Sequence, residues 1–324
     1  MIEEIVEHAN VIRADCDYFL VIATGGPYNG AKAVIEALSH KRVKNSPEVI
    51  FAGDELCAWE LEKIKNMISG KRVWINYISK SGTTLEPKLV FEFLSKDVPK
   101  NKIIYTTTDG KLKGYKTYKI PKGIGGRYSV FTCAGLLPMA VAGLDVQKFV
   151  DGGKNSANLL CKNQLAEGLQ KYEVNLFVFF QKRLEAVGAW LCQLFNESCG
   201  KERKGIFSST TIYPRDLHSL GQMVQDGKRN LIETFIKFED QDECSQFGSL
   251  NKIVYSATLK AHTDGGIPVT EVSIEKLDEF HLGALMQFMM DECVKYCTLI
   301  EVNPFDQPGV EAYKTEMKKL LGVI

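Results

Sequence analysis

The sequence lacks the features that mark secreted, zinc-binding and membrane-spanning chains. Its nine cysteines form no CxxC pair and no Cys/His cluster, a distribution that argues against a disulfide framework and against a zinc site. No apolar run approaches the roughly 20 residues that a helix needs to cross a bilayer, and the acidic N-terminus contains no signal-peptide core. We therefore expect a cytoplasmic protein that does not bind a membrane.

An excess of charge of either sign is also missing. Forty lysine and arginine residues balance 40 aspartate and glutamate residues, so no overall field would attract nucleic acid or an acidic membrane surface. Any anion site must come from local groups. The 324 residues suffice for about two domains of ordinary size, and the apolar and charged fractions are those of a globular protein.

The first half of the chain alternates strand-like and helix-like segments. Apolar runs rich in β-branched and aromatic residues predict buried strands at 18–24, 48–53, 73–78 and 102–108. The segments between them have helical spacing. This alternation predicts parallel strands joined by right-handed crossovers, which is a doubly wound, flavodoxin-like α/β sheet. Ligands of such sheets gather at the carboxyl ends of the strands.

The second half predicts another α/β unit. Residues 123–163 have the composition of a connector, with a glycine-rich loop followed by an apolar helical run. Strand candidates follow at 175–180, 205–213 and 230–238, and the segments 275–297 and 308–321 predict closing helices. We therefore expect a first α/β domain with an N-terminal helix at 1–150, a second α/β domain at 151–300 and a C-terminal helical extension at 301–324.

The segment YISKSGTTLEP, residues 77–87, gathers small hydroxyl side chains at a predicted strand-to-helix turn. Thr83 and Glu86 have capping-box spacing, and Pro87 fits the first turn of a helix. A helix start exposes backbone N–H groups that attract anions. The turn adds four hydroxyls, those of Ser79, Ser81, Thr83 and Thr84. One cap needs only one or two such residues, so the cluster favours an anion site over a simple cap.

Glu197 lies at the end of a predicted helix. Helical spacing puts Gln193 and Glu197 on one face, with Gly200 as the expected stop. A carboxylate there meets the negative end of the helix dipole, which favours the protonated form and suits a general base. The alternative is a solvated surface glutamate, which is the usual fate of this residue type.

Three further residues, His218, Arg127 and Lys314, can each be interpreted either as a functional group or as an ordinary structural residue. In YPRDLHSLGQ, Asp216 is a candidate N-cap and His218 lies in the first helical turn, where a neutral imidazole both donates and accepts; the alternative is an ordinary hydrogen-bonded histidine. Arg127 follows two glycines in KGIGGRYS and suits an oxyanion, or is simply solvated. Lys314 follows Glu311 by three residues, so its alternative is an exposed ion pair.

Together the segments resemble the glucose-6-phosphate isomerase family, whose fold is a pair of sugar-isomerase (SIS) domains. The matching blocks run in the family's order from about Tyr18 to Lys314 and read SKSGTTLEP, GGRYSVFTCAGLLP, QLFNESCGKERKG, YPRDLHSLGQ and NPFDQPGVEAYK. The resemblance implies an aldose–ketose isomerase of glycolysis and gluconeogenesis. It would interconvert glucose 6-phosphate and fructose 6-phosphate through an enediolate, without a metal or another cofactor.

The resemblance also implies a role for each matched residue. Glu197 would move the proton between C2 and C1, and His218 and Lys314 would serve ring opening. Arg127 would stabilise the charge of the enediolate. The other matches hold the sugar phosphate or complete the site, and they are Ser79, Lys80, Ser81, Thr83, Thr84, Gly126, Gln193 and Gln307. Because the family's histidine comes from the neighbouring subunit, the resemblance implies a homodimer with His218 contributed across the interface.

The chain departs from the family pattern in its first glycine-rich loop. In VIATGGPYNG, Pro27 stands where a substrate-binding serine is expected, and proline supplies neither a hydroxyl nor an N–H. Ala23 and Thr24 also differ there. Further along, Cys199 replaces an asparagine and Leu217 replaces a glutamine. These changes bear on affinity and substrate range more than on reaction class.

Two other functions stay open on the sequence alone. One is a bifunctional phosphoglucose/phosphomannose isomerase, and the other is a non-catalytic SIS-domain protein that senses a sugar phosphate. A sensor has no use for Glu197, His218 and Lys314 together, so their joint presence favours the isomerase. The altered first loop is the feature that favours a sensor.

Overall fold

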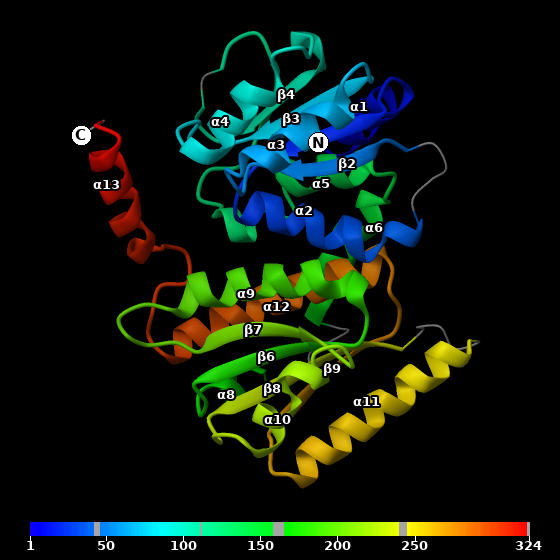
Figure 1. Cartoon of the computed structure of the whole chain (residues 1–324), viewed down its shortest axis with the longest axis vertical. Helices are drawn as coiled ribbons and strands as arrows, with labels where there is room; N and C mark the ends of the chain where they lie inside the picture. The colour runs from blue at the N-terminus through cyan, green and yellow to red at the C-terminus, as the bar shows by residue number, and fades with distance from the viewer. Residues whose placement is uncertain (42–45, 111, 158–164, 240–244, 323–324) are drawn as a thin grey trace. The chain divides into compact units, whose positions relative to one another are not determined.

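The computed structural model describes residues 1–41, 46–110, 112–157, 165–239 and 245–322, and these residues form two α/β units (Figure 1). Unit 1 comprises Met1–Asn155 and Leu277–Ala284, and unit 2 comprises Ser156–Lys276 and Leu285–Ile324. The domain boundaries expected at 150 and 300 stay a prediction. Within the described ranges, no helix combines the length and the apolar character needed to cross a membrane.

Unit 1 is built on a five-stranded parallel sheet with the order β2-β1-β3-β4-β5. Its strands are β1 (Tyr18–Ile22), β2 (Glu48–Ala52), β3 (Val73–Ile78), β4 (Ile103–Thr107) and β5 (Lys116–Lys119). The strands β3 and β4 are buried along their whole length, as expected for a parallel sheet covered on both faces. The first four strands match the predicted ones; β5 was not predicted.

Helices cover both faces of this sheet. They are α1 (Ile2–Ala14), α2 (Gly26–Ala37), α3 (Ala58–Ile68), α4 (Leu85–Leu94), α5 (Cys133–Val141) and α6 (Val146–Lys154). On one face, Ile68 of α3 and Phe91 of α4 pack on a cluster that includes Ile75 and Tyr77. On the other face, α5 contacts α1 and α2. Every residue of α5 is buried, so this part of the predicted connector is core of unit 1. Residues 158–163 lie outside the described part of the chain.

Unit 2 is built on a four-stranded parallel sheet with the order β7-β6-β8-β9. Its strands are β6 (Val174–Phe179), β7 (Phe207–Ile212), β8 (Leu231–Phe238) and β9 (Val269–Ile274). Its helices are α8 (Leu165–Leu169), α9 (Glu185–Cys199), α10 (Leu217–Asp226), α11 (Gln246–Asp264), α13 (Glu311–Leu320) and the part of α12 (Glu279–Leu299) that follows Ala284. The predicted fold class, two parallel-sheet α/β units with a C-terminal helical extension, is confirmed.

The faces of the second sheet are also covered. Val224 of α10 and Tyr255 of α11 pack on a cluster with Val178 and Phe235. On the other face, Phe177 of β6 lies against Phe195 of α9, with ring centroids 5.2 Å apart. Because α9 packs along the sheet, its last turn is brought to a fixed place in unit 2.

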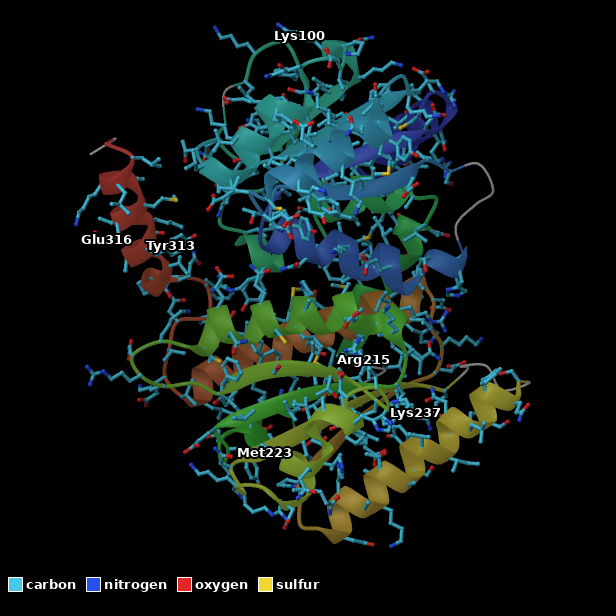
Figure 2. The ribbon with its side chains drawn as sticks, in the orientation of Figure 1. Lys100, Arg215, Met223, Lys237, Tyr313 and Glu316 are labelled. Carbon is cyan, nitrogen blue, oxygen red and sulfur yellow. The ribbon has the colours of Figure 1, made fainter. Side chains whose placement is uncertain are left out.

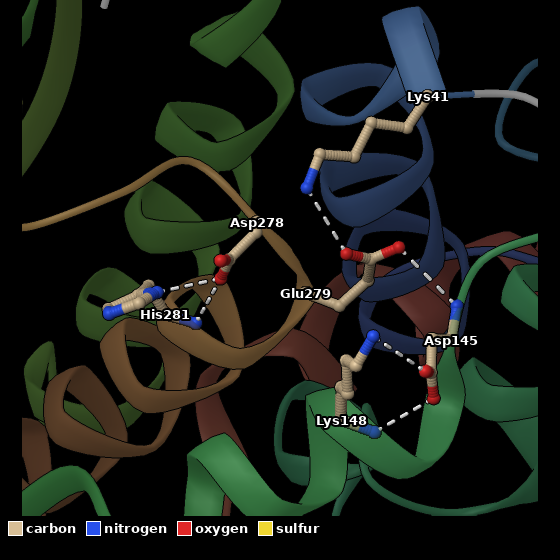
Figure 3. Close-up of polar contacts among 6 residues, drawn as sticks. All are labelled: Lys41, Asp145, Lys148, Asp278, Glu279 and His281. Atoms are coloured by element: carbon tan, nitrogen blue, oxygen red, sulfur yellow. Dashed lines mark hydrogen bonds and ion pairs between the residues drawn. The ribbon is translucent and has the colours of Figure 1, made fainter. Parts of the chain in front are cut away.

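The start of α12 is held in unit 1 by polar contacts (Figure 3). Lys41 Nζ lies 3.3 Å from Glu279 Oε2, and Glu279 Oε1 accepts a hydrogen bond from the Asp145 N–H at 3.4 Å. Asp145 in turn caps α6 by accepting from the Lys148 N–H at 3.0 Å. Residues that are 134 positions apart in the chain are thereby joined within one unit.

Candidate active site

The hydroxyl-rich turn lies at the carboxyl end of β3, as predicted. Ser79 is buried, and its Oγ accepts a hydrogen bond from the Gly82 N–H at 3.1 Å. Ser81 Oγ lies 2.7 Å from Thr83 Oγ1 and accepts from the Thr83 N–H at 3.2 Å. Gly82 has a φ of +74°, a left-handed conformation that suits glycine. The hydroxyls therefore order the turn itself.

The capping box predicted for Thr83 and Glu86 is not formed. The helix α4 begins at Leu85, its N-cap is Thr84, and the Thr84 side chain makes no capping hydrogen bond. Thr83 bonds Ser81 within the turn, and this local contact competes with capping. The backbone N–H groups of the first turn of α4 are consequently not capped by Thr84 and suit an anion.

The backbone of Lys80 ties the turn to the end of β4. Its carbonyl accepts from the Thr108 N–H at 3.2 Å, from the Asp109 N–H at 3.1 Å and from Thr107 Oγ1 at 3.0 Å. The Lys80 side chain itself is exposed. Thr107 was missed in the sequence analysis, although a run of three threonines at the end of a predicted strand was a usable signal.

Arg127 is buried although it carries a charge, with only 2% of its surface exposed. It lies in a short 3-10 helix (Gly126–Tyr128), and its guanidinium carbon is 5.4 Å from the centroid of the Tyr128 ring, which is a cation–π distance. A Cβ on Gly26 would lie 2.0 Å from the Gly126 carbonyl carbon. The two glycine-rich loops are thus packed backbone against backbone, which requires glycine at position 26.

Pro27 fits this junction. It lies in the first turn of α2, where proline costs no hydrogen bond because the N–H would have no partner within the helix. A Cβ on Gly126 would lie 3.2 Å from Pro27 Cδ, so the ring sits beside the Gly126–Arg127 loop. The departure from the family pattern is accommodated by the backbone of unit 1.

In unit 2, Gln193 and Glu197 are joined on one face of α9, which confirms the predicted shared face. Gln193 Nε2 donates to Glu197 Oε2 at 2.9 Å, and both residues are half-buried. The helix ends at Cys199 with Gly200 as its C-cap, as predicted. Cys199 is buried, and burial raises the pKa of its thiol to about 11; its Sγ donates to the Ile206 carbonyl.

His218 lies in the first turn of α10 and is exposed. Asp216 occupies the predicted N-cap position, but its carboxylate accepts from the Ile212 N–H at 2.7 Å and does not cap the helix. Arg215, labelled in Figure 2, pairs with Asp216 at 2.7 Å and with Glu185 at 2.8 Å. The hydrogen bond from Arg215 lowers the pKa of Asp216. The turn before His218 is therefore fixed by ionic contacts.

Gln307 and Lys314 lie on the C-terminal segment of unit 2. Gln307 is half-buried and precedes a short 3-10 helix (Pro308–Val310). Lys314 Nζ lies 2.7 Å from Glu311 Oε1, so the exposed ion pair named as its alternative is present. Figure 2 shows Tyr313 and Glu316 projecting from the same helix, α13. None of the described side chains of α13 is buried.

The structure thus brings the predicted residues together in two groups. In unit 1, Ser79 to Thr84 form one turn at a strand end, and Gly126 and Arg127 form a second loop packed on the start of α2. In unit 2, Gln193 and Glu197 are in direct contact. Among the described residues, no group of three His, Cys, Asp or Glu side chains is placed to hold a metal ion.

Comparison with known proteins gives close relatives of this chain. No family model matches it. It is 38% identical to a protein named glucose-6-phosphate isomerase from Caldanaerobacter subterraneus subsp. tengcongensis, over 99% of this chain and 83% of that relative. It is 39% identical to a glucose-6-phosphate isomerase from Shouchella clausii, over 97% of this chain and 82% of that relative.

A solved structure has the same fold. The glucose-6-phosphate isomerase from Chlamydia trachomatis superposes with a TM-score of 0.86 at 18% identity, over 99% of this chain and 73% of that one. The match covers both α/β units. From the identity over nearly the whole chain, we conclude that it belongs to the glucose-6-phosphate isomerase family.

Proposed function

We propose that this protein interconverts D-glucose 6-phosphate and D-fructose 6-phosphate by proton transfer through an enediolate. The observation that carries the proposal is the contact between Gln193 and Glu197 at 2.9 Å, in a chain whose relatives bear the isomerase name. The amide donor orients one carboxylate oxygen, and the half-buried setting limits solvation. An oriented carboxylate suits the transfer of a proton between neighbouring carbons.

The phosphate of the sugar binds at the turn of unit 1. The backbone N–H groups at the start of α4 and the hydroxyls of Ser79, Ser81, Thr83 and Thr84 supply donors, and Lys80 contributes through its backbone. The Ser81–Thr83 pair is exposed, so either hydroxyl can exchange its partner for a phosphate oxygen. The turn keeps its shape meanwhile, because three donors hold the Lys80 carbonyl.

The chemistry begins with the open-chain sugar. His218 and Lys314 pass the ring-opening proton between the anomeric hydroxyl and the ring oxygen. Glu197 then takes the C2 proton of the aldose, and the electron pair moves to give an enediolate with its charge on O1. The hydroxyl proton on O2 passes to O1, and Glu197 returns its proton to C1, which leaves the ketose. The role proposed for Arg127 and Gly126 is to stabilise the developing charge, where one donor is worth about 3 kcal/mol.

We further propose that the active form is a homodimer in which His218 reaches the site of a second copy. His218 is exposed on α10, and two apolar side chains of the same helix, Leu220 and Met223, are also exposed. Covering them by a second chain would bury apolar surface. The C-terminal segment, residues 301–324, completes the site with Gln307 and Lys314.

We place the reaction in the cytoplasm. Seven cysteines lie in the described residues, and none of these seven forms a disulfide. Cysteines without disulfides in this number are typical of a reducing compartment. The substrate is a sugar phosphate.

The test is turnover of fructose 6-phosphate to glucose 6-phosphate in buffer that contains EDTA, for the purified protein and for Glu197→Gln. We expect conversion by the unmodified protein and a loss of at least 100-fold in the variant. Glu173→Gln is the matched control, because Glu173 is exposed, pairs with Lys228 and has no proposed part in the site. Intact binding of fructose 6-phosphate without any conversion by the unmodified protein would contradict the isomerase and favour a sensor.

A further inference from the structure

Lys201 is the second residue after the end of α9, and its side chain is buried. Only 7% of that side chain is exposed. Its Nζ donates to the Ser198 carbonyl at 2.7 Å and to the Asn303 carbonyl, and it lies 3.0 Å from Asp306 Oδ1. A lysine ammonium has three N–H donors, and here three oxygens from two distant segments surround it.

This arrangement links the two segments strongly. A buried ammonium is costly unless it is paired and hydrogen-bonded. Its partners at 303 and 306 are more than 100 residues away in the chain, so the ammonium is satisfied only when the end of α9 and the 303–306 segment are both in place. Displacing either segment would leave a charge buried without its full set of partners.

Apolar packing does not fill the space around this contact. A cavity of about 440 Å³ lies between residues 200–202 and residues 303–309. Asn303, Phe305 and Asp306 are all exposed. The contacts of the Lys201 ammonium therefore bridge a gap that side-chain packing leaves open.

The backbone that follows α9 forms a tight turn around Lys201. Glu202 and Arg203 both have positive φ, +52° and +60°, a conformation that non-glycine residues seldom adopt. Gly205 has a φ of +95°, and a Cβ there would lie 2.4 Å from the Cys199 carbonyl oxygen. The turn is thus folded tightly back on the last turn of α9, next to Glu197.

The two segments joined by Lys201 carry different parts of the proposed machinery. Ser198, which accepts from Lys201, directly follows Glu197, and Asp306 directly precedes Gln307 on the way to Lys314. All of them belong to unit 2. We propose that Lys201 is a positioning residue, which sets the place of the segment carrying Gln307 and Lys314 relative to Glu197. This inference rests on the proposed isomerase function.

The test replaces Lys201 by methionine, which keeps the length of the side chain and removes the ammonium. We expect kcat to fall by about tenfold to 100-fold, because small displacements of catalytic groups are costly. We expect the KM for fructose 6-phosphate to change by less than about threefold, because the phosphate donors lie in unit 1. Lys204→Met is the control: Lys204 lies in the same turn, bonds the Ile300 carbonyl at 3.1 Å and pairs with Glu202 at 3.7 Å. It should retain normal kcat.

Hydrogen–deuterium exchange tests the positioning role of Lys201 independently of the proposed isomerase activity. In Lys201→Met, peptides covering 301–310 should exchange faster while peptides covering 185–195 stay unchanged, whether or not the protein is an isomerase. Asp306→Asn, which changes an exposed partner, should shift exchange in the same direction if Lys201→Met does not fold. Unchanged exchange at 301–310 with unchanged kcat would overturn the positioning role. Faster exchange in a protein that never converts fructose 6-phosphate would instead overturn only the isomerase.

Discussion

In unit 1 the first strand, β1, lies between β2 and β3, with β4 beyond β3; in unit 2 the first strand, β6, lies between β7 and β8, with β9 beyond β8. Each sheet also buries an Asn–Thr pair across neighbouring strands. Thr106 Oγ1 donates to Asn76 Oδ1 at 2.8 Å in unit 1, and Thr234 Oγ1 donates to Asn175 Oδ1 at 2.8 Å in unit 2. In both units the pair joins diagonal positions of adjacent strands, but the strands are not equivalent, being β3 and β4 in unit 1 and β6 and β8 in unit 2.

The interiors of the two units contain different kinds of contact. In unit 1, Tyr77 stacks on Phe91 at 4.5 Å and on Tyr105 at 5.4 Å between ring centroids. In unit 2, fully buried Glu233 accepts from Tyr213 Oη at 2.6 Å, and its other oxygen lies 2.6 Å from His262 Nδ1. Tyr213 opens the block that leads to His218. The polar interior of unit 2 thus anchors a segment that the proposed reaction uses, whereas aromatic stacking supports the turn of unit 1.

The largest expected effect tests whether proton transfer depends on unit 2 and phosphate binding on unit 1. Glu197→Gln in unit 2 should lower kcat by about 10²- to 10⁴-fold, because it removes the proposed proton carrier and keeps the side-chain shape. The KM should change little, since the phosphate donors lie in unit 1. Steady-state kinetics with fructose 6-phosphate measures both constants. A variant that raises KM and keeps kcat would show that Glu197 binds substrate and does not move the proton.

The second prediction removes one buried tyrosine hydroxyl from each unit. Tyr213→Phe removes a donor from the buried Glu233 carboxyl group and should lower the free energy of unfolding by about 1–3 kcal/mol. Tyr105→Phe removes a buried hydroxyl that has no hydrogen-bond partner among the described residues, so it should be neutral or slightly stabilising. Urea unfolding of the two variants measures the difference. Equal losses would mean that the Glu233 contact contributes nothing beyond the packing of the ring.

Burial also raises the pKa of the Tyr213 phenol above its ordinary value, and the neighbouring Glu233 carboxylate raises it further. The phenol therefore stays protonated and remains a donor over the working pH range. Raising the pH through the ordinary titration range of tyrosine leaves this hydrogen bond in place. The stability gained from it should thus be lost in Tyr213→Phe at pH 7 and at pH 9 alike.

The third prediction concerns the turn of unit 1. Thr84→Val keeps the shape of the side chain and removes one hydroxyl, so the KM for fructose 6-phosphate should rise by about fivefold to tenfold, which corresponds to one hydrogen bond of about 1 kcal/mol. The value of kcat should stay within about twofold. Thr117→Val on β5 is the matched control, since its hydroxyl bonds the Tyr115 carbonyl at 3.2 Å away from the turn. Equal KM values for the two variants would argue against a phosphate site at Thr84.

The interior strands could be predicted from sequence because they bury both faces. Val73–Ile78 is buried at all six positions, and five of its six residues are aliphatic or aromatic, as expected for an interior parallel strand. The strands β5 and β9 lie at the edges of their sheets, and each has exposed positions along its length. Edge strands mix polar and apolar residues: of the four edge strands, β2 and β7 were predicted, and β5 and β9 were not.

The candidate site could be predicted as a set of residues but not as a set of contacts. The pair of Gln193 and Glu197 is local, so helical spacing was sufficient. Thr83 and Asp216 were expected to cap helices, but tertiary and turn contacts take their oxygens instead. Lys201 gave no signal, because its partners lie about 100 residues further along the chain, and only folding brings them together.

The smallest expected effect contrasts one exposed thiol of unit 1 with two thiols on α9 of unit 2. Cys57 in unit 1 is exposed, whereas burial raises the pKa of Cys192 and of Cys199 in unit 2 to about 11. Since the thiolate is the reactive form, iodoacetamide at pH 8 should label Cys57 within minutes and leave half-buried Cys192 and buried Cys199 unlabelled. Labelling of Cys199 should rise only as the pH approaches 11. Peptide mass spectrometry measures each site separately, and Cys57→Ser is the control for reagent specificity.

Activity should be unchanged after labelling of Cys57, because Cys57 precedes α3 and lies outside every contact proposed for the site. Rapid labelling of Cys199 at pH 8 would show that the end of α9 opens readily, and the tight turn described after Gly200 would then not hold in solution.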